Sequence, residues 1–141
     1  MNETNEMNEI VRPVIVVADD DRDICELVEL QLSRHGFQVI IANNGEMALE
    51  LIGLHRPVVA LLDIMMPKLS GLVVARRVRD DPATSQTGII MFSARSTFGS
   101  KDDVDEIGVD DYISKPFSPQ DLLQRINDVI IRRQKNQSTQ I

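Results

Sequence analysis

The fold is decided by the stretch Val58-Val59-Ala60-Leu61-Leu62-Asp63-Ile64-Met65-Met66-Pro67, in which an apolar run leads directly to one carboxylate. A short apolar run bounded by turn signals is typical of a strand that is covered on both faces, as in a parallel sheet. In open α/β sheets, ligands bind beyond the carboxyl ends of the strands. Asp63 therefore lies where chemistry is expected, although a polar residue that simply closes a strand explains this position equally well.

Further apolar runs of strand length surround this stretch, and segments with helical spacing separate them. The predicted strands cover residues 14–18, 37–42, 58–63, 89–92 and 111–114. Helices are predicted over residues 22–35, 46–54, 71–79 and from 119 onward, with Asn44, Ser70 and Ser118 as N-caps. Helical spacing in the first of these places Ile24, Leu27, Val28 and Leu32 on one face. A short, marginal helix is expected within residues 95–107, which offer few apolar side chains for burial. The alternation indicates βαβ units, and hence an α/β fold with helices on both faces of a parallel sheet.

The composition fits a single domain. The chain has 141 residues, of which 43% are hydrophobic and 26% are charged, as is ordinary for a soluble globular protein. Residues 1–12 predict a disordered or loosely attached arm, residues 13–132 the domain, and residues 133–141 a polar tail that frays. The chain has no apolar run of membrane-spanning length and no signal sequence, so we expect a cytoplasmic protein without membrane contact.

Charge and cysteine content argue against several classes of protein. A net charge of −7 argues against direct binding to nucleic acid, which needs a basic face. The single cysteine, Cys25, excludes an internal disulfide, and its place in a helical pattern favours packing over nucleophilic chemistry. No glycine-rich phosphate loop follows the first strand, which argues against a flavin or nucleotide binder.

Polar side chains follow four of the predicted strands and so come to one edge of the sheet. They are Asp19 and Asp20, Asp63, Ser93 and Lys115. Clustered carboxylates repel one another unless a cation lies among them, and ligand sets made only of oxygen suit Mg²⁺. A carboxylate can itself be the nucleophile of phosphoryl transfer, while a metal, a lysine and a hydroxyl stabilise the transferred group. Each residue alone has an ordinary structural explanation, but together they predict a phosphoryl-transfer site.

Four motifs lie at these strand ends. They are Val16-Val17-Ala18-Asp19-Asp20-Asp21, Leu62-Asp63-Ile64-Met65-Met66-Pro67 followed by Gly71, Phe92-Ser93-Ala94, and Asp110-Asp111-Tyr112-Ile113-Ser114-Lys115-Pro116-Phe117. With these motifs the chain resembles a receiver domain of the two-component response-regulator family over about residues 13–132. The resemblance implies a flavodoxin-like, doubly wound, five-stranded parallel sheet with strand order 2-1-3-4-5.

The resemblance also implies a role for each residue at the site. Asp63 is expected to be the phosphoacceptor. Asp20, Asp63 and the backbone carbonyl of Met65 are expected to bind Mg²⁺ or Mn²⁺ directly, and Asp19 is expected to bind it through water. Lys115 is expected to pair with the phosphoryl group.

Two further residues are expected to report phosphorylation to the surface. Ser93 would hydrogen-bond to the phosphoryl group, and Tyr112 would turn inward behind it, changing the face made by the fourth helix, the fifth strand and the last helix. The peptide bond before Pro116 is expected to be cis. The implied partners are a sensor histidine kinase or phosphotransfer protein as donor, and a downstream protein target or an effector domain outside this chain. A homodimer through the output face is one option.

The resemblance thus implies a signalling switch, either stand-alone or part of a longer regulator, that catalyses only its own phosphorylation and slow dephosphorylation. Slow hydrolysis is expected because the apolar Met65, two residues past Asp63, cannot orient a water molecule. The alternative enzyme is a phosphohydrolase with an aspartate nucleophile, which usually needs an acid at that position. A third hypothesis is a degenerate receiver that is not phosphorylated and works only as a docking domain. The chain has the complete set of site residues, which argues against this hypothesis: Asp20, Asp63, Ser93 and Lys115.

Overall fold

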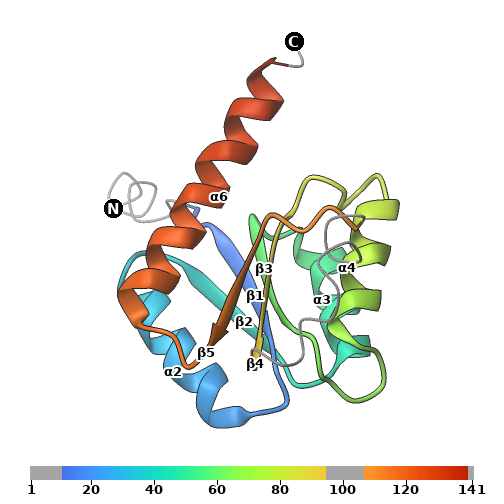
Figure 1. Ribbon diagram of the computed structural model, residues 1–141. Helices are drawn as coiled ribbons and strands as arrows, with labels where there is room; N and C mark the ends of the chain where they lie inside the picture. The colour runs from blue at the N-terminus through green and yellow to red at the C-terminus, as the bar shows by residue number, and fades with distance from the viewer. Residues whose placement is uncertain (1–10, 95–106, 140–141) are drawn as a thin grey trace, which may run out of the picture.

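The computed structural model describes residues 11–94 and 107–139, and these form a five-stranded sheet flanked by helices (Figure 1). The strands are β1 (Val14–Ala18), β2 (Gln38–Ala42), β3 (Val59–Asp63), β4 (Gly88–Ala94) and β5 (Asp111–Lys115). Neighbouring strands are parallel in the order β2-β1-β3-β4-β5, which confirms the predicted order. Most of the expected arm and nearly all of the expected short helix within 95–107 lie outside the described residues.

Helices cover both faces of the sheet. They are α2 (Arg22–Ser33), α3 (Gly45–His55), α4 (Gly71–Asp80) and α6 (Pro119–Thr139). Figure 1 shows α2 and α6 on one side of the sheet and α3 and α4 on the other. In β1, Ile15 and Val17 pack into the hydrophobic core beneath α2 and α6. Val16 and Ala18 pack into the core beneath α3 and α4. Burial on both faces explains why the central strands are continuous apolar runs.

Side chains cap the helices where the sequence predicts. The predicted N-caps Asn44, Ser70 and Ser118 each accept a hydrogen bond from the backbone N–H three residues later, so these caps are confirmed. In α2 the buried residues are Cys25, Val28 and Leu32. Helical spacing also predicts Leu27 on the buried face of α2, which is wrong, because Leu27 is 54% exposed.

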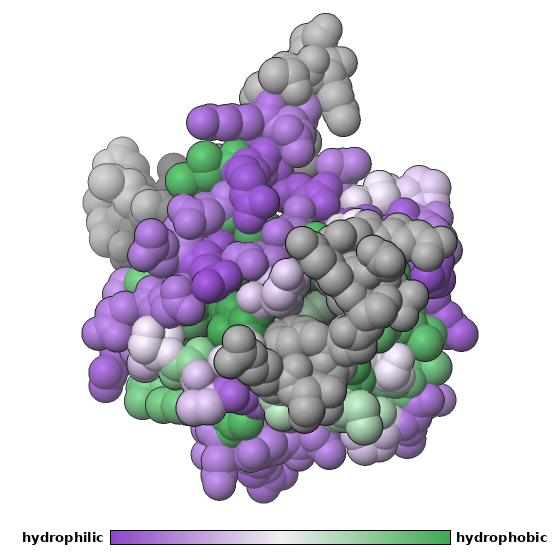
Figure 2. Space-filling model, viewed as in Figure 1, coloured by the Kyte–Doolittle hydropathy of each residue, from purple (hydrophilic) through white to green (hydrophobic). Residues whose placement is uncertain are grey.

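The helix α6 continues past the predicted end of the domain. The prediction of a frayed tail from residue 133 is wrong over the described residues, because α6 remains helical to Thr139 and projects beyond the sheet (Figure 1). The part of the surface from which α6 projects carries mainly hydrophilic residues (Figure 2). Within residues 11–94 and 107–139, no helix is both long and apolar enough to cross a membrane.

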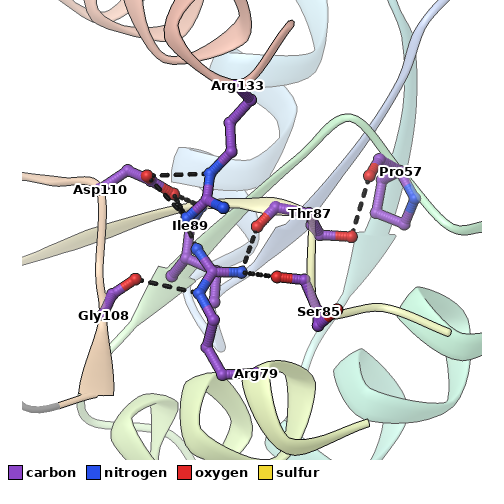
Figure 3. Close-up of polar contacts among 8 residues, drawn as sticks. All are labelled: Pro57, Arg79, Ser85, Thr87, Ile89, Gly108, Asp110 and Arg133. Atoms are coloured by element: carbon purple, nitrogen blue, oxygen red, sulfur yellow. Dashed lines mark hydrogen bonds and ion pairs between the residues drawn. The ribbon is translucent and has the colours of Figure 1, made fainter. Parts of the chain in front are cut away.

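A single carboxylate joins α4, α6 and the amino-terminal ends of β4 and β5 (Figure 3). Asp110 Oδ2 accepts hydrogen bonds from Arg79 Nη2 and from the backbone N–H of Ile89, both at 2.8 Å. Asp110 Oδ1 accepts another from Arg133 Nε at 3.0 Å. Arg79 also donates to the carbonyl oxygens of Gly108, Ser85 and Thr87. We call the side chains of Arg79, Asp110 and Arg133 the Asp110 joint. This joint links the two helices to the amino-terminal ends of β4 and β5, opposite the carboxyl ends of the strands.

Candidate phosphoacceptor site

The parallel register brings the predicted site residues to one edge of the sheet. Asp63 is the last residue of β3 and pairs with Phe92, so Ser93 follows it by one position on β4. Lys115 is the last residue of β5 and pairs with the residue after Ser93. Asp19 directly follows β1. The carboxyl ends of four strands therefore contribute to a single polar pocket, as predicted from the order of the chain.

Three carboxylates meet in this pocket. Carboxylate oxygens of Asp19, Asp20 and Asp63 all lie within 4.8 Å of one another. Asp19 and Asp63 are 1% and 5% exposed, whereas Asp20 faces solvent. Burial raises the pKa of Asp19 to about 6, although hydrogen bonds from Lys115 and from the backbone N–H of Asp21 oppose the effect. The pocket therefore favours any added positive charge.

Lys115 already supplies one positive charge to the pocket. Its Nζ lies 2.7 Å from Asp19 Oδ2 and 3.2 Å from Asp63 Oδ2. Burial lowers the pKa of Lys115, but its hydrogen bonds and ion pairs with the two carboxylates outweigh this effect and hold the pKa above its ordinary value. The same Nζ lies 5.0 Å from the centroid of the Phe92 ring, which limits the positions of the ammonium group.

Hydrogen bonds orient both oxygens of the Asp63 carboxylate. Ser93 Oγ donates to Asp63 Oδ1 at 2.8 Å, and the backbone N–H of Met65 donates to the same oxygen at 3.3 Å. Asp63 Oδ2 accepts from Lys115 Nζ. The acceptor predicted from the end of a strand is therefore a buried carboxylate flanked by a hydroxyl, an ammonium and two more carboxylates.

The structure also places the other predicted residues. The peptide bond between Lys115 and Pro116 is cis, as the resemblance implies. Tyr112 lies on β5 and is 42% exposed, so its inward movement stays a prediction. The side chain of Met65 is 63% exposed, and the role of its carbonyl as a metal ligand also stays a prediction.

Sequence reasoning missed several groups that touch the site. The backbone N–H of Asp21 donates to Asp19 Oδ1 at 2.9 Å, and Cys25 Sγ donates to the carbonyl oxygen of Asp19 at 3.3 Å. Asp21 could have been found, since it caps α2 and its backbone turns at the end of β1. The contact of Phe92 with Lys115 had no such signal, because it depends on side-chain conformations in two strands.

Comparison with known proteins identifies the family. The family model described as "Response regulator receiver domain" matches residues 15–127. The chain belongs to this family. The receiver domain is a module of phosphorylation-dependent signalling, so this broad class of function follows from the membership.

Individual relatives agree with this membership. The "Probable transcriptional regulator ycf27" of Guillardia theta is 40% identical over 121 residues, which are 86% of this chain and 46% of that protein. The "Phosphate regulon transcriptional regulatory protein PhoB" of Pseudomonas aeruginosa is 37% identical over 123 residues, which are 87% of this chain and 54% of that protein. The chain thus spans about half the length of these curated relatives. The solved structure of a CheY-like receiver domain protein from Methanospirillum hungatei has a TM-score of 0.83 and 25% identity, over 89% of this chain and 99% of that one.

Proposed function

We propose that this receiver domain is a signalling switch that accepts a phosphoryl group on Asp63 from a histidine kinase or a histidine phosphotransfer protein. One observation carries the proposal: the buried carboxylate of Asp63 is hydrogen-bonded by Ser93 and Lys115 and lies within 4.8 Å of two further carboxylates. A residue that merely closes a strand needs none of these neighbours. A site for phosphoryl transfer uses all of them.

The proposed transfer creates an acyl phosphate. One carboxylate oxygen of Asp63 forms a bond to phosphorus, the bond from phosphorus to the donor histidine nitrogen breaks, and its electron pair remains on that nitrogen. Ser93 Oγ and Lys115 Nζ, which now donate to Asp63, can then donate to the oxygens of the phosphoryl group. Their charge and hydrogen bonds stabilise the negative charge on that group.

The donor set of the pocket suits Mg²⁺ or Mn²⁺. Asp19, Asp20 and Asp63 offer only oxygen atoms, and Asp20 leaves the pocket open to solvent on one side, which suits an ion that keeps several of its waters. These residues and the carbonyl of Met65 would hold the ion. When bound, it would neutralise charge on the phosphoryl group.

The output of the switch is proposed to run through β5. Ser93 and Lys115 lie on neighbouring strands, so a shift of both toward a phosphoryl group would move the end of β5. Tyr112 lies on that strand, partly exposed, and would follow inward. The target is a downstream protein or an effector domain. The curated relatives are named as transcriptional regulators and are about twice as long as this chain.

We further propose that the chain catalyses only its own phosphorylation and a slow hydrolysis of the product. A phosphohydrolase would need a general acid near position 65, where the structure places the exposed, apolar side chain of Met65. A phosphoryl half-life of roughly minutes or longer is expected, and one of seconds would contradict slow hydrolysis.

Incubation with acetyl phosphate and Mg²⁺, followed by intact mass measurement, tests the proposal. The wild-type chain should gain one phosphoryl group, which base should remove, and Asp63→Ala should gain none. Asp21→Asn is the matched control, because Asp21 is exposed and caps α2 through its side chain. An unmodified wild-type chain would refute the switch, whereas continuous release of phosphate from a small phosphomonoester would favour the hydrolase.

A further inference from the structure

The first residue of α4 lies against the backbone of the acceptor aspartate. The N–H of Gly71 donates to the carbonyl oxygen of Ile64 at 2.9 Å. A Cβ atom at position 71 would lie only 2.1 Å from the carbonyl oxygen of Asp63 and 2.8 Å from its carbonyl carbon. Side chains cannot approach backbone atoms this closely. Only glycine therefore allows α4 to start at this distance from the end of β3.

The first residue of α3 makes an equivalent contact with the far end of the loop that joins β3 to α4. The N–H of Gly45 donates to the carbonyl oxygen of Pro67 at 3.2 Å. A Cβ atom at position 45 would lie 2.0 Å from the carbonyl oxygen of Leu69 and 2.6 Å from its Cβ. These are backbone atoms or the atom next to the backbone, so no change of rotamer could relieve the clash. Gly45 thus fixes the loop from a helix that supplies no residue to the acidic pocket.

The loop between these contacts, residues 64–70, carries part of the site. The N–H of Met65 donates to Asp63 Oδ1 at 3.3 Å, and its carbonyl is a proposed metal ligand. Lys68 holds a left-handed backbone with φ of 71°, which a non-glycine residue adopts only where its surroundings impose it. A small shift of this loop would therefore move a hydrogen bond to the acceptor and a proposed ligand together.

We propose that Gly45 and Gly71 are positioning residues of the phosphoacceptor site, which hold loop 64–70 so that Met65 and Asp63 face the cation. This inference rests on the proposed function. Gly53 provides a control within α3, because a Cβ atom there would meet nothing within 4 Å. The chain therefore offers the same substitution with and without the backbone contact.

The experiment compares Gly45→Ala, Gly71→Ala and Gly53→Ala with the wild type. Calorimetry measures the Kd for Mg²⁺, hydrogen exchange of the metal-free chain measures protection of individual amides, and urea denaturation confirms that each variant is folded. Gly45→Ala and Gly71→Ala should weaken Mg²⁺ binding about tenfold, as for groups that orient metal ligands. Exchange should accelerate in residues 64–70 while the sheet amides stay protected. Gly53→Ala should leave both readouts unchanged.

Several outcomes would overturn the inference. A folded Gly45→Ala variant with wild-type Mg²⁺ affinity and loop protection would do so, even if the wild type is phosphorylated. If Gly45→Ala does not fold, Leu69→Ala is used instead, because it should loosen the same loop while keeping the glycine. Faster hydrogen exchange in residues 64–70 with unchanged Mg²⁺ affinity in that variant would overturn the inference. Weaker Mg²⁺ binding in Gly45→Ala with no phosphorylation of the wild type would support the positioning role while refuting the switch. A wild-type chain that binds no Mg²⁺ would overturn both proposals.

Discussion

Lys115 forms ion pairs with two buried carboxylates, so its removal leaves both without this positively charged partner. Its Nζ lies 2.7 Å from Asp19 and 3.2 Å from Asp63, and its side chain is 20% exposed. We expect Lys115→Met to lower the free energy of unfolding of the metal-free chain by about 2 kcal/mol, less than for a fully buried ion pair. Urea denaturation measures this, with the exposed Lys135→Met as control. Equal losses in both variants would contradict the expectation.

The thiol of Cys25 should make stability depend on alkaline pH. Burial raises its pKa from 9.0 to about 11, and the negative charge of Asp19 adds to the effect. The unfolded chain therefore loses the thiol proton first. The contribution of Cys25 is fully present below about pH 9 and is lost as the pH rises toward about 11. In urea denaturation at each pH, the wild type should lose more stability over this window than Cys25→Ser, and parallel curves would refute the prediction.

At this scale the sequence predicts which residues form the pocket but not how they share their contacts. Strand ends alone place Asp63, Ser93 and Lys115 together, because parallel strands align their carboxyl ends. The division of Lys115 between two carboxylates depends on side-chain conformations, which a pattern does not contain. The close approach of Gly45 to Leu69 depends on the distance between two backbone segments that are far apart in sequence.

At the scale of elements, the Asp110 joint should hold the projecting part of α6. Arg133 Nε and Nη2 lie 3.0 and 3.1 Å from the two oxygens of Asp110, and the Arg133 side chain is 19% exposed. We expect Arg133→Ala to lower the free energy of unfolding by about 1–3 kcal/mol, because a mostly buried carboxylate loses a charged partner. Thermal or urea denaturation measures the loss.

Hydrogen exchange gives a second readout for the same variant. The amides of residues 134–139 should exchange faster in Arg133→Ala, because the ion pair between this helix and Asp110 is gone. Lys135→Ala changes a solvent-facing residue of the same helix and is the control. If both alanine variants protect these amides like the wild type, the joint does not hold the end of α6.

The elements themselves were largely predictable, with errors that have physical causes. The caps at Asn44, Ser70 and Ser118 follow from side-chain chemistry, and the central strands follow from burial on both faces. The end of α6 was not predictable, because its last residues show no apolar periodicity, and the contact of Arg133 with Asp110 joins residues 23 positions apart in the chain. Leu27 follows helical spacing yet faces solvent, because Cys25 lies on the buried face of α2.

At the scale of the whole molecule, β5 connects two clusters of polar side chains, one at each end of the strand. Its last residue, Lys115, lies in the acidic pocket, and Asp110, just before its first residue, forms the joint with α4 and α6. A change at the pocket that displaces Lys115 would therefore act on a strand whose other end is fixed. Movement should therefore concentrate at the carboxyl end of β5, at Ser114 and Lys115, rather than shift the strand as a whole.

Mg²⁺ should stabilise the whole fold, because it would bind a cluster of carboxylates that exists only in the folded chain. An ion present at about 100 times its Kd adds about 2.7 kcal/mol to the free energy of unfolding. Urea denaturation with increasing MgCl₂ measures the gain, and NaCl at the same ionic strength corrects for screening. Asp20→Asn, which removes the exposed ligand, should lose most of the gain, whereas Asp21→Asn should keep it. Equal stabilisation by the two salts would show that these carboxylates do not form a site for a divalent ion.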